Sequence, residues 1–440
     1  METFLIKAAQ LILSLSILVV LHELGHFIPA KIFKTRVEKF YLFFDVKFSL
    51  FKKKIGETVY GIGWLPLGGY VKIAGMIDES MDTEQMKQPP QPWEFRSKPA
   101  WQRLIIMVGG VTVNIIVGFL IYGLILANYG REIVTTENIP LGFAVAEQLN
   151  PYGFEDGDRV VAINGKPLEN LLDVNTQVML RKIQDIEVLK QDGSKKHLTL
   201  PEDIGMTLFK EGVMYPFTPY ATAEIKNILP DSPAEKAGLK SGDKILYAND
   251  QAITYWHDFE RFIRKNSGQN FQLTFMSSGE EKTAEVTPYE TGKIGIEVAT
   301  KPLLETTQVD YTLGQGLASG VGFGINVLRN YVGQLKYVFT KQGASQLGGF
   351  GAIGGLFPAQ WDWQSFWMTT ALISIILAFM NILPIPALDG GHVMFLLYEM
   401  ITGRTPNQKV LEYAQMIGFF LLIALLLYAN GNDIYRALTK

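Results

Sequence analysis

Four long apolar runs without a single charge constrain this chain more than any other feature. They cover residues 8–21, 104–128, 364–388 and 413–432 of the 440-residue sequence. A helix of about 20 apolar residues spans the hydrocarbon core of a bilayer. The runs therefore predict four transmembrane helices, the first of which continues past residue 21. The alternative is a set of buried helices inside a large soluble core.

The overall composition excludes several classes of protein. Hydrophobic residues make up 48% of the chain and charged residues 19%, which excludes a disordered chain. Lys and Arg number 40 against 43 Asp and Glu, so a strongly basic nucleic-acid binder is excluded and no nucleic-acid partner is expected. The sequence has no cysteine, so no disulfide indicates the compartment.

The first apolar run could be a cleaved signal peptide. However, Glu2 and Lys7 are the only charged residues before the run, so the charged n-region of a signal peptide is lacking. No small-x-small cleavage site follows Leu21 either. Cleavage nearby would also detach the HELGH sequence that begins at His22. We therefore expect a retained helix.

The positive charges predict the orientation of the spans. Residues 31–103 are rich in Lys and Arg close to both neighbouring spans, and the short connection between the last two spans carries Arg404 and Lys409. Such segments stay in the cytoplasm. The N-terminus, residues 130–310 and the C-terminus are then expected on the opposite, extracytoplasmic or periplasmic, side.

The extramembrane stretch contains an internal repeat. Residues 154–168 align without gaps on residues 239–253. Each copy has Gly-Asp, then an alternating apolar strand, then Asn-Gly or Asn-Asp, which is typical of a hairpin turn. The sequence therefore predicts two β-rich domains.

Each copy also contains an apolar-Gly-apolar triplet farther along, at residues 204–206 and 294–296, which we expect to form a loop at the end of each copy. With residues 231–246, DSPAEKAGLKSGDKIL, this pattern resembles PDZ domains of the circularly permuted type found in bacterial proteases. Such domains bind peptides by strand addition and hold a terminal carboxylate with backbone amides. A purely structural cap on the membrane part is the alternative.

The sequence His22-Glu23-Leu24-Gly25-His26 carries the strongest chemical signal. Residues at i and i+4 share one helix face, so both imidazoles can bind one metal ion. A catalytic zinc site needs three protein ligands and a water whose proton Glu23 can accept. Ionisable groups within a membrane span are functional by default. The alternative is a solvated helix end with incidental histidines.

A third ligand is expected from the segment NILPIPALDGGH, residues 381–392. Asp389 follows 25 uncharged residues, an unfavourable place for a carboxylate unless it meets a cation. Pro384 and Pro386 interrupt the helix, which is tolerated at membrane depth only inside protein or a wet cavity. Asp389 is therefore the candidate third ligand. His392 is an alternative ligand, or an outer hydrogen-bond partner.

HExxH in the first span together with NxxPxPxLDGG in a later span resembles the site-2 protease family of intramembrane zinc metalloproteases. With its tandem PDZ-like insert, the chain resembles the bacterial branch of this family, whose members cut anti-sigma factors. The resemblance implies that His22, His26 and Asp389 bind Zn²⁺ and that Glu23 is the catalytic acid and base. It also implies that Asn381 helps to bind substrate or the transition state, although a buried amide can simply join helices.

The stretch 36–75 alternates polar and apolar residues and is rich in Gly. In the family a membrane-associated β region at this place is thought to receive the substrate as an added strand, and residues 63–72 match its pattern. The resemblance therefore implies that Gly68, Gly69, Tyr70 and Val71 bind substrate. An extended strand edge suits a substrate helix that must unwind before hydrolysis.

Three features complete the sequence pattern. Gly109, Gly110 and Asn114 in the second span favour close helix packing. Residues 311–340 are amphipathic and predict an interfacial helix. The Gly-rich stretch 347–358 departs from the family's version, which leaves the geometry before the third span open.

The predicted fold is a membrane α-helical core of four transmembrane helices with a membrane-associated β region and two inserted PDZ-like β-rich domains. The expected parts are 1–30, the first span; 31–99, the cytoplasmic β region; 100–129, the second span; 130–215 and 216–300, the PDZ-like domains; 301–362, the interfacial helix and Gly-rich loop; 363–400, the third span; and 401–440, the fourth span and C-terminus.

The predicted function is intramembrane cleavage of single-span membrane proteins, of the anti-sigma-factor type or signal-peptide remnants, after a first cut, in the bacterial inner membrane. The PDZ-like pair would exclude bulky ectodomains or sense a new peptide C-terminus. Three alternatives are a membrane zinc protease with a Glu ligand in place of Asp389, a non-proteolytic PDZ scaffold, and a transporter with a mid-membrane carboxylate.

Overall fold

The computed structural model describes residues 2–76, 88–298 and 303–439. The chain divides into two compact units, one made of Met1–Gly130 with Asp310–Lys440, and the other of Arg131–Val309. Small parts of the expected cytoplasmic β region and of the second PDZ-like domain, residues 77–87 and 299–300, lie outside the described residues.

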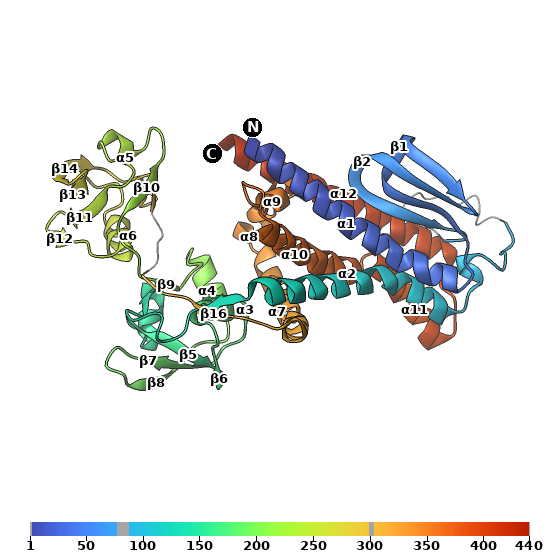
Figure 1. Cartoon of the computed structure of the whole chain (residues 1–440), viewed down its shortest axis with the longest axis horizontal. Helices are drawn as coiled ribbons and strands as arrows, with labels where there is room; N and C mark the ends of the chain where they lie inside the picture. Colours follow the sequence, from blue (N-terminus) through green and yellow to red (C-terminus); the bar gives the residue numbers. More distant parts are fainter. Residues whose placement is uncertain (1, 77–87, 299–302, 440) are drawn as a thin grey trace. The chain divides into compact units, whose positions relative to one another are not determined.

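The first unit is mostly helical (Figure 1). Its helices are α1 (Glu2–Ile32), η2 (Phe95–Ser97), α2 (Ala100–Tyr129), α7 (Leu313–Val338), α8 (Lys341–Gln346), α9 (Phe350–Gly355), α10 (Trp363–Ile382), α11 (Asp389–Thr402) and α12 (Gln408–Thr439). In the described chain, four of them, α1, α2, α10 and α12, are long and apolar enough to cross a membrane. This confirms the four predicted spans.

Helix α2 is the centre of the first unit, because α1, α7, α10 and α11 all pack against it. Glycines permit the close approaches. A Cβ on Gly25 would overlap the backbone of Gly109, and a Cβ on Gly109 would overlap Gly25. On another side of α2, the glycines of α7 pack in the same manner, with Gly320 against Gly123. Small residues therefore set the helix spacing, as expected for membrane helices.

The third span ends before the LDGG sequence. Helix α10 stops at Ile382, and a new helix, α11, starts at Asp389. The connection contains the two prolines and Ala387, which has a φ of 75°. A Cβ on Gly390 would overlap the carbonyl groups of Ile382 and Leu383. Glycine at this position therefore lets α11 begin directly against the end of α10.

The predicted β region is a long bent hairpin of β1 (Val37–Ile55) and β2 (Thr58–Ile73). The first part of β1, residues 37–42, pairs on one side with residues 59–62 and on the other with residues 69–73. Within the described chain, residues 69–73 pair only with β1. They are therefore an edge segment with backbone groups on their second side.

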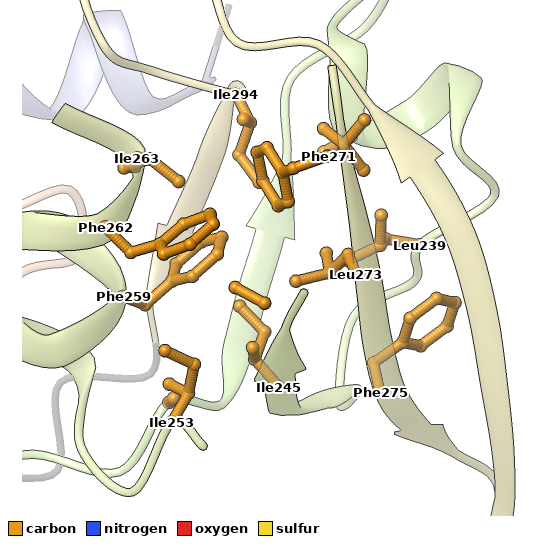
Figure 2. Packing of buried hydrophobic residues seen from close by; sticks show 14 of the residues in the cluster. Leu239, Ile245, Ile253, Phe259, Phe262, Ile263, Phe271, Leu273, Phe275 and Ile294 are labelled. Atoms are coloured by element: carbon orange, nitrogen blue, oxygen red, sulfur yellow. The ribbon is translucent and has the colours of Figure 1, made fainter. Parts of the chain in front are cut away.

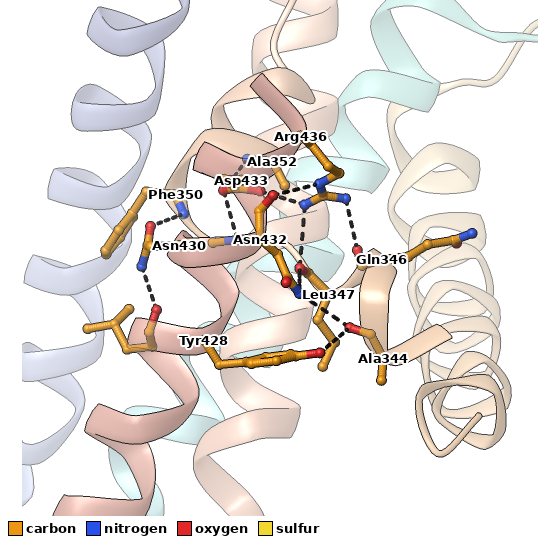
Figure 3. A network of polar contacts seen from close by, with 12 residues as sticks. Ala344, Gln346, Leu347, Phe350, Ala352, Tyr428, Asn430, Asn432, Asp433 and Arg436 are labelled. Atoms are coloured by element: carbon orange, nitrogen blue, oxygen red, sulfur yellow. Dashed lines mark hydrogen bonds and ion pairs between the residues drawn. The ribbon is translucent and has the colours of Figure 1, made fainter. Parts of the chain in front are cut away.

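The Gly-rich stretch before α10 folds into α9 and is held by the end of α12 (Figure 3). The carboxylate of Asp433 accepts hydrogen bonds from the backbone N–H groups of Gly349 (2.9 Å) and Ala352 (3.0 Å). Asn430 accepts a third from Phe350 (3.2 Å). These side chains satisfy amides at the start of a short helix that has no capping residue of its own.

The second unit consists of small sheets and short helices. Its elements are β3 (Arg131–Ile133), β4 (Phe143–Val145), η3 (Glu147–Tyr152), β5 (Arg159–Ile163), β6 (Lys166–Pro167), η4 (Leu171–Asp173), α3 (Val174–Leu180), β7 (Asp185–Leu189), β8 (Lys195–Thr199), α4 (Ile204–Lys210), β9 (Phe217–Pro219), β10 (Ile225–Ile228), α5 (Pro233–Lys236), β11 (Lys244–Ala248), β12 (Gln251–Ala252), α6 (Trp256–Lys265), β13 (Phe271–Ser277), β14 (Glu280–Val286), β15 (Ile296–Val298) and β16 (Thr307–Val309).

The internal repeat is confirmed by matching sheet topology. The two copies contain four-stranded sheets of order β6-β5-β7-β8 and β12-β11-β13-β14, and two-stranded sheets β4-β9 and β10-β15. The predicted hairpin turns also match. Asn164 and Gly165 both have positive φ between β5 and β6, and Asn249 has a φ of 50° between β11 and β12.

The second copy has its own apolar core (Figure 2). Phe259, Phe262 and Ile263 of α6 point toward the sheet, where they meet Leu273 and Phe271 among the buried residues. On another face of α6, Arg261 donates to the Asp156 carboxylate of the first copy at 2.6 Å.

One sequence correspondence was wrong. The triplet at residues 204–206, expected as a loop like residues 294–296, starts helix α4 instead. A Cβ on Gly205 would overlap the carbonyl oxygens of Val178 and Met179, so this glycine packs α4 onto the end of α3. A three-residue apolar-Gly-apolar pattern serves helix packing as readily as loop formation.

Candidate metal centre

His22, His26 and Asp389 lie together, with one candidate ligand atom of each within 4.8 Å of the others. The Nε2 atoms of the two histidines are 3.2 Å apart. The Oδ2 atom of Asp389 is 3.2 Å from the Nε2 of His22 and 3.4 Å from the Nε2 of His26. Ligands at about 2.0 Å from a tetrahedral zinc ion are about 3.3 Å from one another. The three atoms therefore have the spacing of ligands to a single ion.

Local structure explains how residues far apart in sequence meet. The two histidines lie one turn apart on α1, with ring centroids 4.9 Å apart. Asp389 is the first residue of α11, where the helix dipole favours a negative charge. Helix α2 lies against both α1 and α11 and joins the two motifs.

The second nitrogen of each imidazole has a hydrogen-bond partner on α2. Nδ1 of His26 is 2.8 Å from the carbonyl oxygen of Ile106 and therefore donates to it. The neutral imidazole then carries no proton on Nε2, whose lone pair can bind a metal ion. Nδ1 of His22 lies 3.2 Å from the side-chain amide of Asn114. When the amide of Asn114 is oriented so that its Oδ1 accepts from the Nδ1–H of His22, Nε2 of His22 also carries a free lone pair.

Gly110 keeps space open beside the imidazoles. A Cβ at this position would lie 2.6 Å from Cε1 and 2.8 Å from Nε2 of His22, and would also overlap Nε2 of His26. Any other residue would therefore occupy the volume next to both nitrogens.

The donor set fits zinc. Two neutral imidazoles and a carboxylate are a common catalytic zinc set that leaves a fourth position for water. Within the described chain, Oδ2 of Asp389 is buried and has no hydrogen-bond donor. A buried carboxylate oxygen facing two imidazole lone pairs is favourable only with a cation between them.

Glu23 lies in the same cavity, which has a volume of about 470 Å³. The backbone amide of Val71, in the β2 edge segment, lies beside the Glu23 carboxyl group. Most of the cavity wall is apolar, from α1, α9, α10 and β2. The geometry places one carboxyl group, separate from the three clustered residues, next to a strand edge in a largely apolar space.

The other sequence-predicted residues also reach this cavity. The amide nitrogen of Asn381 is 3.5 Å from Nε2 of His22. His392 lines the wall with its Nε2 2.8 Å from the Gln415 amide of α12. Among the described residues, the clustered ligand group does not include His392. Its place favours an outer polar role over metal ligation.

Gly68, Gly69, Tyr70 and Val71 form the cavity wall contributed by β2. A Cβ on Gly69 would lie 2.7 Å from a methyl group of Val19, so glycine permits this edge to approach α1. The hydroxyl group of Tyr70 donates to Asp45 of β1 at 2.8 Å. The Tyr70 side chain is thus tied to the hairpin.

Sequence reasoning missed three features of this site. It assigned Gly110 and Asn114 to helix packing alone, whereas they lie against the imidazoles, and it did not single out Gln415 beside His392. The uncommon asparagine in the middle of an apolar span was the available signal.

Comparisons with known proteins agree with this site. The model of peptidase family M50 matches residues 10–425. The chain is 28% identical to the regulator of sigma-E protease RseP of Escherichia coli K12, over 99% of this chain and 100% of that protein. It is 27% identical to the regulator of sigma E protease of Haemophilus influenzae, with 99% and 100% covered, and 27% identical to a candidate zinc metalloprotease of Neisseria meningitidis, with 97% and 98% covered. The chain belongs to peptidase family M50, the site-2 protease family, and is a zinc metalloendopeptidase.

Proposed function

We propose that this enzyme cleaves the transmembrane segments of single-span membrane proteins, with His22, His26 and Asp389 holding Zn²⁺ and Glu23 moving the protons. The observation that carries the proposal is the convergence of these four residues in one cavity among membrane spans, beside the edge of β2. A non-proteolytic scaffold would need neither the ligand spacing nor the separate carboxyl group.

When bound, zinc would supply a Lewis acid that polarises the scissile carbonyl and lowers the pKa of a water molecule. Glu23 accepts the proton of the attacking water and later donates it to the leaving amine. Asn381, next to His22, donates its amide hydrogens to the carbonyl oxygen on which negative charge develops. The apolar wall excludes bulk water and so strengthens these interactions.

The β2 edge positions the substrate. A transmembrane helix hides its peptide bonds within its own hydrogen bonds, so the scissile segment must become extended before attack. Residues 68–71 line the cavity along the edge of β2, and an unwound segment pairs there as an added strand. Val71 beside Glu23 places the paired segment next to the proton-transfer group.

Two of the relatives are named as regulators of sigma E, which favours an anti-sigma factor as the substrate in a bacterial inner membrane. Lys and Arg flank α1 and α2 on the side of the β hairpin, which favours cytoplasmic placement of that side. The N- and C-termini and residues 131–309 are then periplasmic.

The repeats of the second unit resemble PDZ domains, and we assign them a filtering role. They exclude bulky extramembrane domains, so that only substrates trimmed by a first cut reach the cavity. Cleavage of substrates carrying folded ectodomains of increasing size tests this filter. Equal cleavage of large and trimmed substrates would reject it.

The metal and proton-transfer roles are separable by experiment. Asp389→Ala should lose bound zinc, measured by metal analysis of the purified protein, together with activity. Glu23→Gln should retain zinc and lose at least about 100-fold in cleavage rate, because it removes the general base but no ligand. An Asp389→Ala chain with full zinc content would reject the ligand assignment. A Glu23→Gln chain with unchanged turnover would favour the scaffold alternative.

A further inference from the structure

Helix α11 carries Asp389 at its first residue and is anchored near its other end by an ion pair. The carboxylate of Glu399, in the last turn of α11, contacts the guanidinium group of Arg103, in the first turn of α2. Only 14% of the Arg103 side chain and 15% of the Glu399 side chain are exposed. Two charged groups are thus largely withdrawn from water, which is unfavourable unless they are paired.

Arg103 is itself held at two points. Its Nε–H donates to the carbonyl oxygen of Lys98 at 2.9 Å, just before α2 begins, while another nitrogen of the same planar group contacts Glu399. A guanidinium group that makes two bonds at fixed angles has little freedom to follow a moving partner. The ion pair therefore fixes the end of α11 to the start of α2.

The stretch of α2 that begins at Arg103 also orients a histidine. One turn after Arg103, the carbonyl oxygen of Ile106 accepts the hydrogen bond from Nδ1 of His26. The same part of α2 therefore supports the candidate metal centre from two sides. It bonds directly to one imidazole, and through Arg103 it holds the helix that carries Asp389.

The residue spacing on α11 makes this helix a lever. Asp389, Leu396 and Glu399 are at positions i, i+7 and i+10, which lie along one face of a helix. Leu396 is buried in an apolar core that includes Ile106, so it is the natural pivot. At 1.5 Å per residue, Asp389 is about 10 Å from this pivot and Glu399 about 4.5 Å. A displacement at Glu399 is therefore about doubled at Asp389.

A metal centre tolerates little such movement. Its ligand distances are held to about 0.2 Å, so the lever reaches this limit when Glu399 moves by about 0.1 Å. A group without a fixed partner moves farther in thermal motion, by about 0.5 Å. Gly390 and Gly391, which follow Asp389, pack against the backbone of residues 382–386 and supply no side chain that interlocks. The anchor at the far end of α11 is therefore needed to hold the carboxylate still.

We propose that Arg103 and Glu399 are positioning residues for the metal centre: their ion pair sets the tilt of α11 and thereby brings Oδ2 of Asp389 to the distance at which it shares one ion with the two imidazoles. Neither residue belongs to the ligand cluster of the described chain or lines the cavity. The inference rests on the proposed role of Asp389 as a zinc ligand and deepens it by naming what holds that ligand in place.

Replacing both partners with methionine is the central test. Methionine has a similar volume without a charge, and exchanging an ion pair for apolar residues of similar volume is often neutral or stabilising. Arg103→Met/Glu399→Met should therefore fold with a Tm near that of wild type. It should nevertheless bind zinc about tenfold or more weakly, as variants that lose an outer partner of a metal ligand do. Competition between the purified full-length protein and a chelator of known affinity gives the zinc Kd.

The single variants show whether the pair acts as a unit. Arg103→Met and Glu399→Met should each weaken zinc binding at least as much as the double substitution, because each leaves a largely buried charge without its partner. Visible absorption of the protein loaded with Co²⁺ instead of zinc gives a second readout, since it depends on the coordination geometry of the ion. The double variant should differ from wild type in this spectrum, which a purely structural role of the ion pair would leave unchanged.

The ion pair between Arg96 and Glu94 is the matched control. Its side chains are also largely withdrawn from water, at 17% and 4% exposed, but the pair belongs to neither α2 nor α11. Arg96→Met/Glu94→Met should keep the zinc Kd within about twofold of wild type and should keep the wild-type Co²⁺ spectrum.

The outcomes separate this inference from the ligand assignment. If Asp389→Ala loses zinc while Arg103→Met/Glu399→Met keeps the wild-type Kd and spectrum, the positioning role is overturned and the ligand assignment stands. If Asp389→Ala keeps its zinc, both are overturned. A control variant that loses as much zinc affinity as Arg103→Met/Glu399→Met would also overturn the positioning role, because the loss would then follow from removing any buried ion pair.

Discussion

Replacing Gly110 with alanine tests whether the space beside the imidazoles is needed for zinc. The new Cβ would lie 2.6 Å from Cε1 and 2.8 Å from Nε2 of His22. Carbon atoms in contact are normally about 3.5–4.0 Å apart, so the overlap with the ring is about 0.7 Å or more. Helix α2 cannot retreat freely, because α7, α10 and α11 also pack against it. The imidazoles must therefore move.

A shift of this size exceeds the tolerance of a metal site, in which ligand distances are held to about 0.2 Å. We expect Gly110→Ala to lower zinc affinity about 10- to 100-fold, comparable to the loss of an outer hydrogen bond to a ligand. Competition between the purified protein and a chelator of known affinity measures the zinc Kd. Cleavage of a trimmed substrate at saturating zinc then separates lost metal from lost geometry.

Gly118→Ala is the matched control on the same helix. Its Cβ would lie 2.7 Å from Cδ1 and 2.9 Å from Cγ1 of Ile375, an aliphatic side chain outside the ligand cluster. This variant should bind zinc within about twofold of wild type. Gly110→Ala with a wild-type zinc Kd and rate would refute the reasoning, because the imidazoles would then have room that the structure does not show.

Three further predictions follow from the described contacts. Asn114→Leu removes the hydrogen bond that orients an imidazole of the HELGH sequence and should weaken zinc binding about tenfold in the same chelator assay, while Tm stays near wild type. Lys190→Met leaves the Asp158 carboxylate, whose side chain is 2% exposed, without its ion pair, and should destabilise the second unit by about 3–5 kcal/mol in denaturant unfolding; an unchanged midpoint would contradict this. Burial alone would raise the pKa of Asp156, but hydrogen bonds from Arg261 and the backbone hold it below its ordinary value of 3.8. The ion pair between Asp156 of the first copy and Arg261 of the second is therefore fully present above that value and is lost only as the pH falls through the lowered pKa of Asp156. Hydrogen exchange near Asp156 and Arg261 should be constant from pH 5 to 8 and should rise only in stronger acid.

The sequence was sufficient for features that lie within one element. His22 and His26 share a helix face by spacing alone, and Asp389 was conspicuous because of its uncharged surroundings. The roles of Gly110 and Asn114 were not predictable in this way. They depend on the rotation of α2 about its axis, which is set by the close contact of Gly109 with Gly25. A helix in an apolar run gives no sequence signal for that rotation.

The β repeats show the same limit at a different level. The hairpin turn at Asn164 was predictable because local chemistry determines it. The segment of the first copy that corresponds to residues 294–296 was not predictable, because α4 is inserted before β9 and carries its own apolar-Gly-apolar sequence. Strand pairing identifies the matching place. The N–H of Ala146 donates to the carbonyl of Pro216 as the N–H of Leu229 donates to the carbonyl of Gly295.

The separation of the ligands along the chain has a consequence for biosynthesis. Asn381, which contacts His22, lies 359 residues after it, and the whole second unit is inserted between them. At about 5–20 residues per second, a ribosome needs on the order of tens of seconds to synthesise that interval. During this time the nascent chain carries the HELGH sequence without its carboxylate partner. In the proposed assignment the ligand set is incomplete until α10 and α11 have entered the membrane, so the chain is expected to cut no neighbouring chain in the insertion machinery before then.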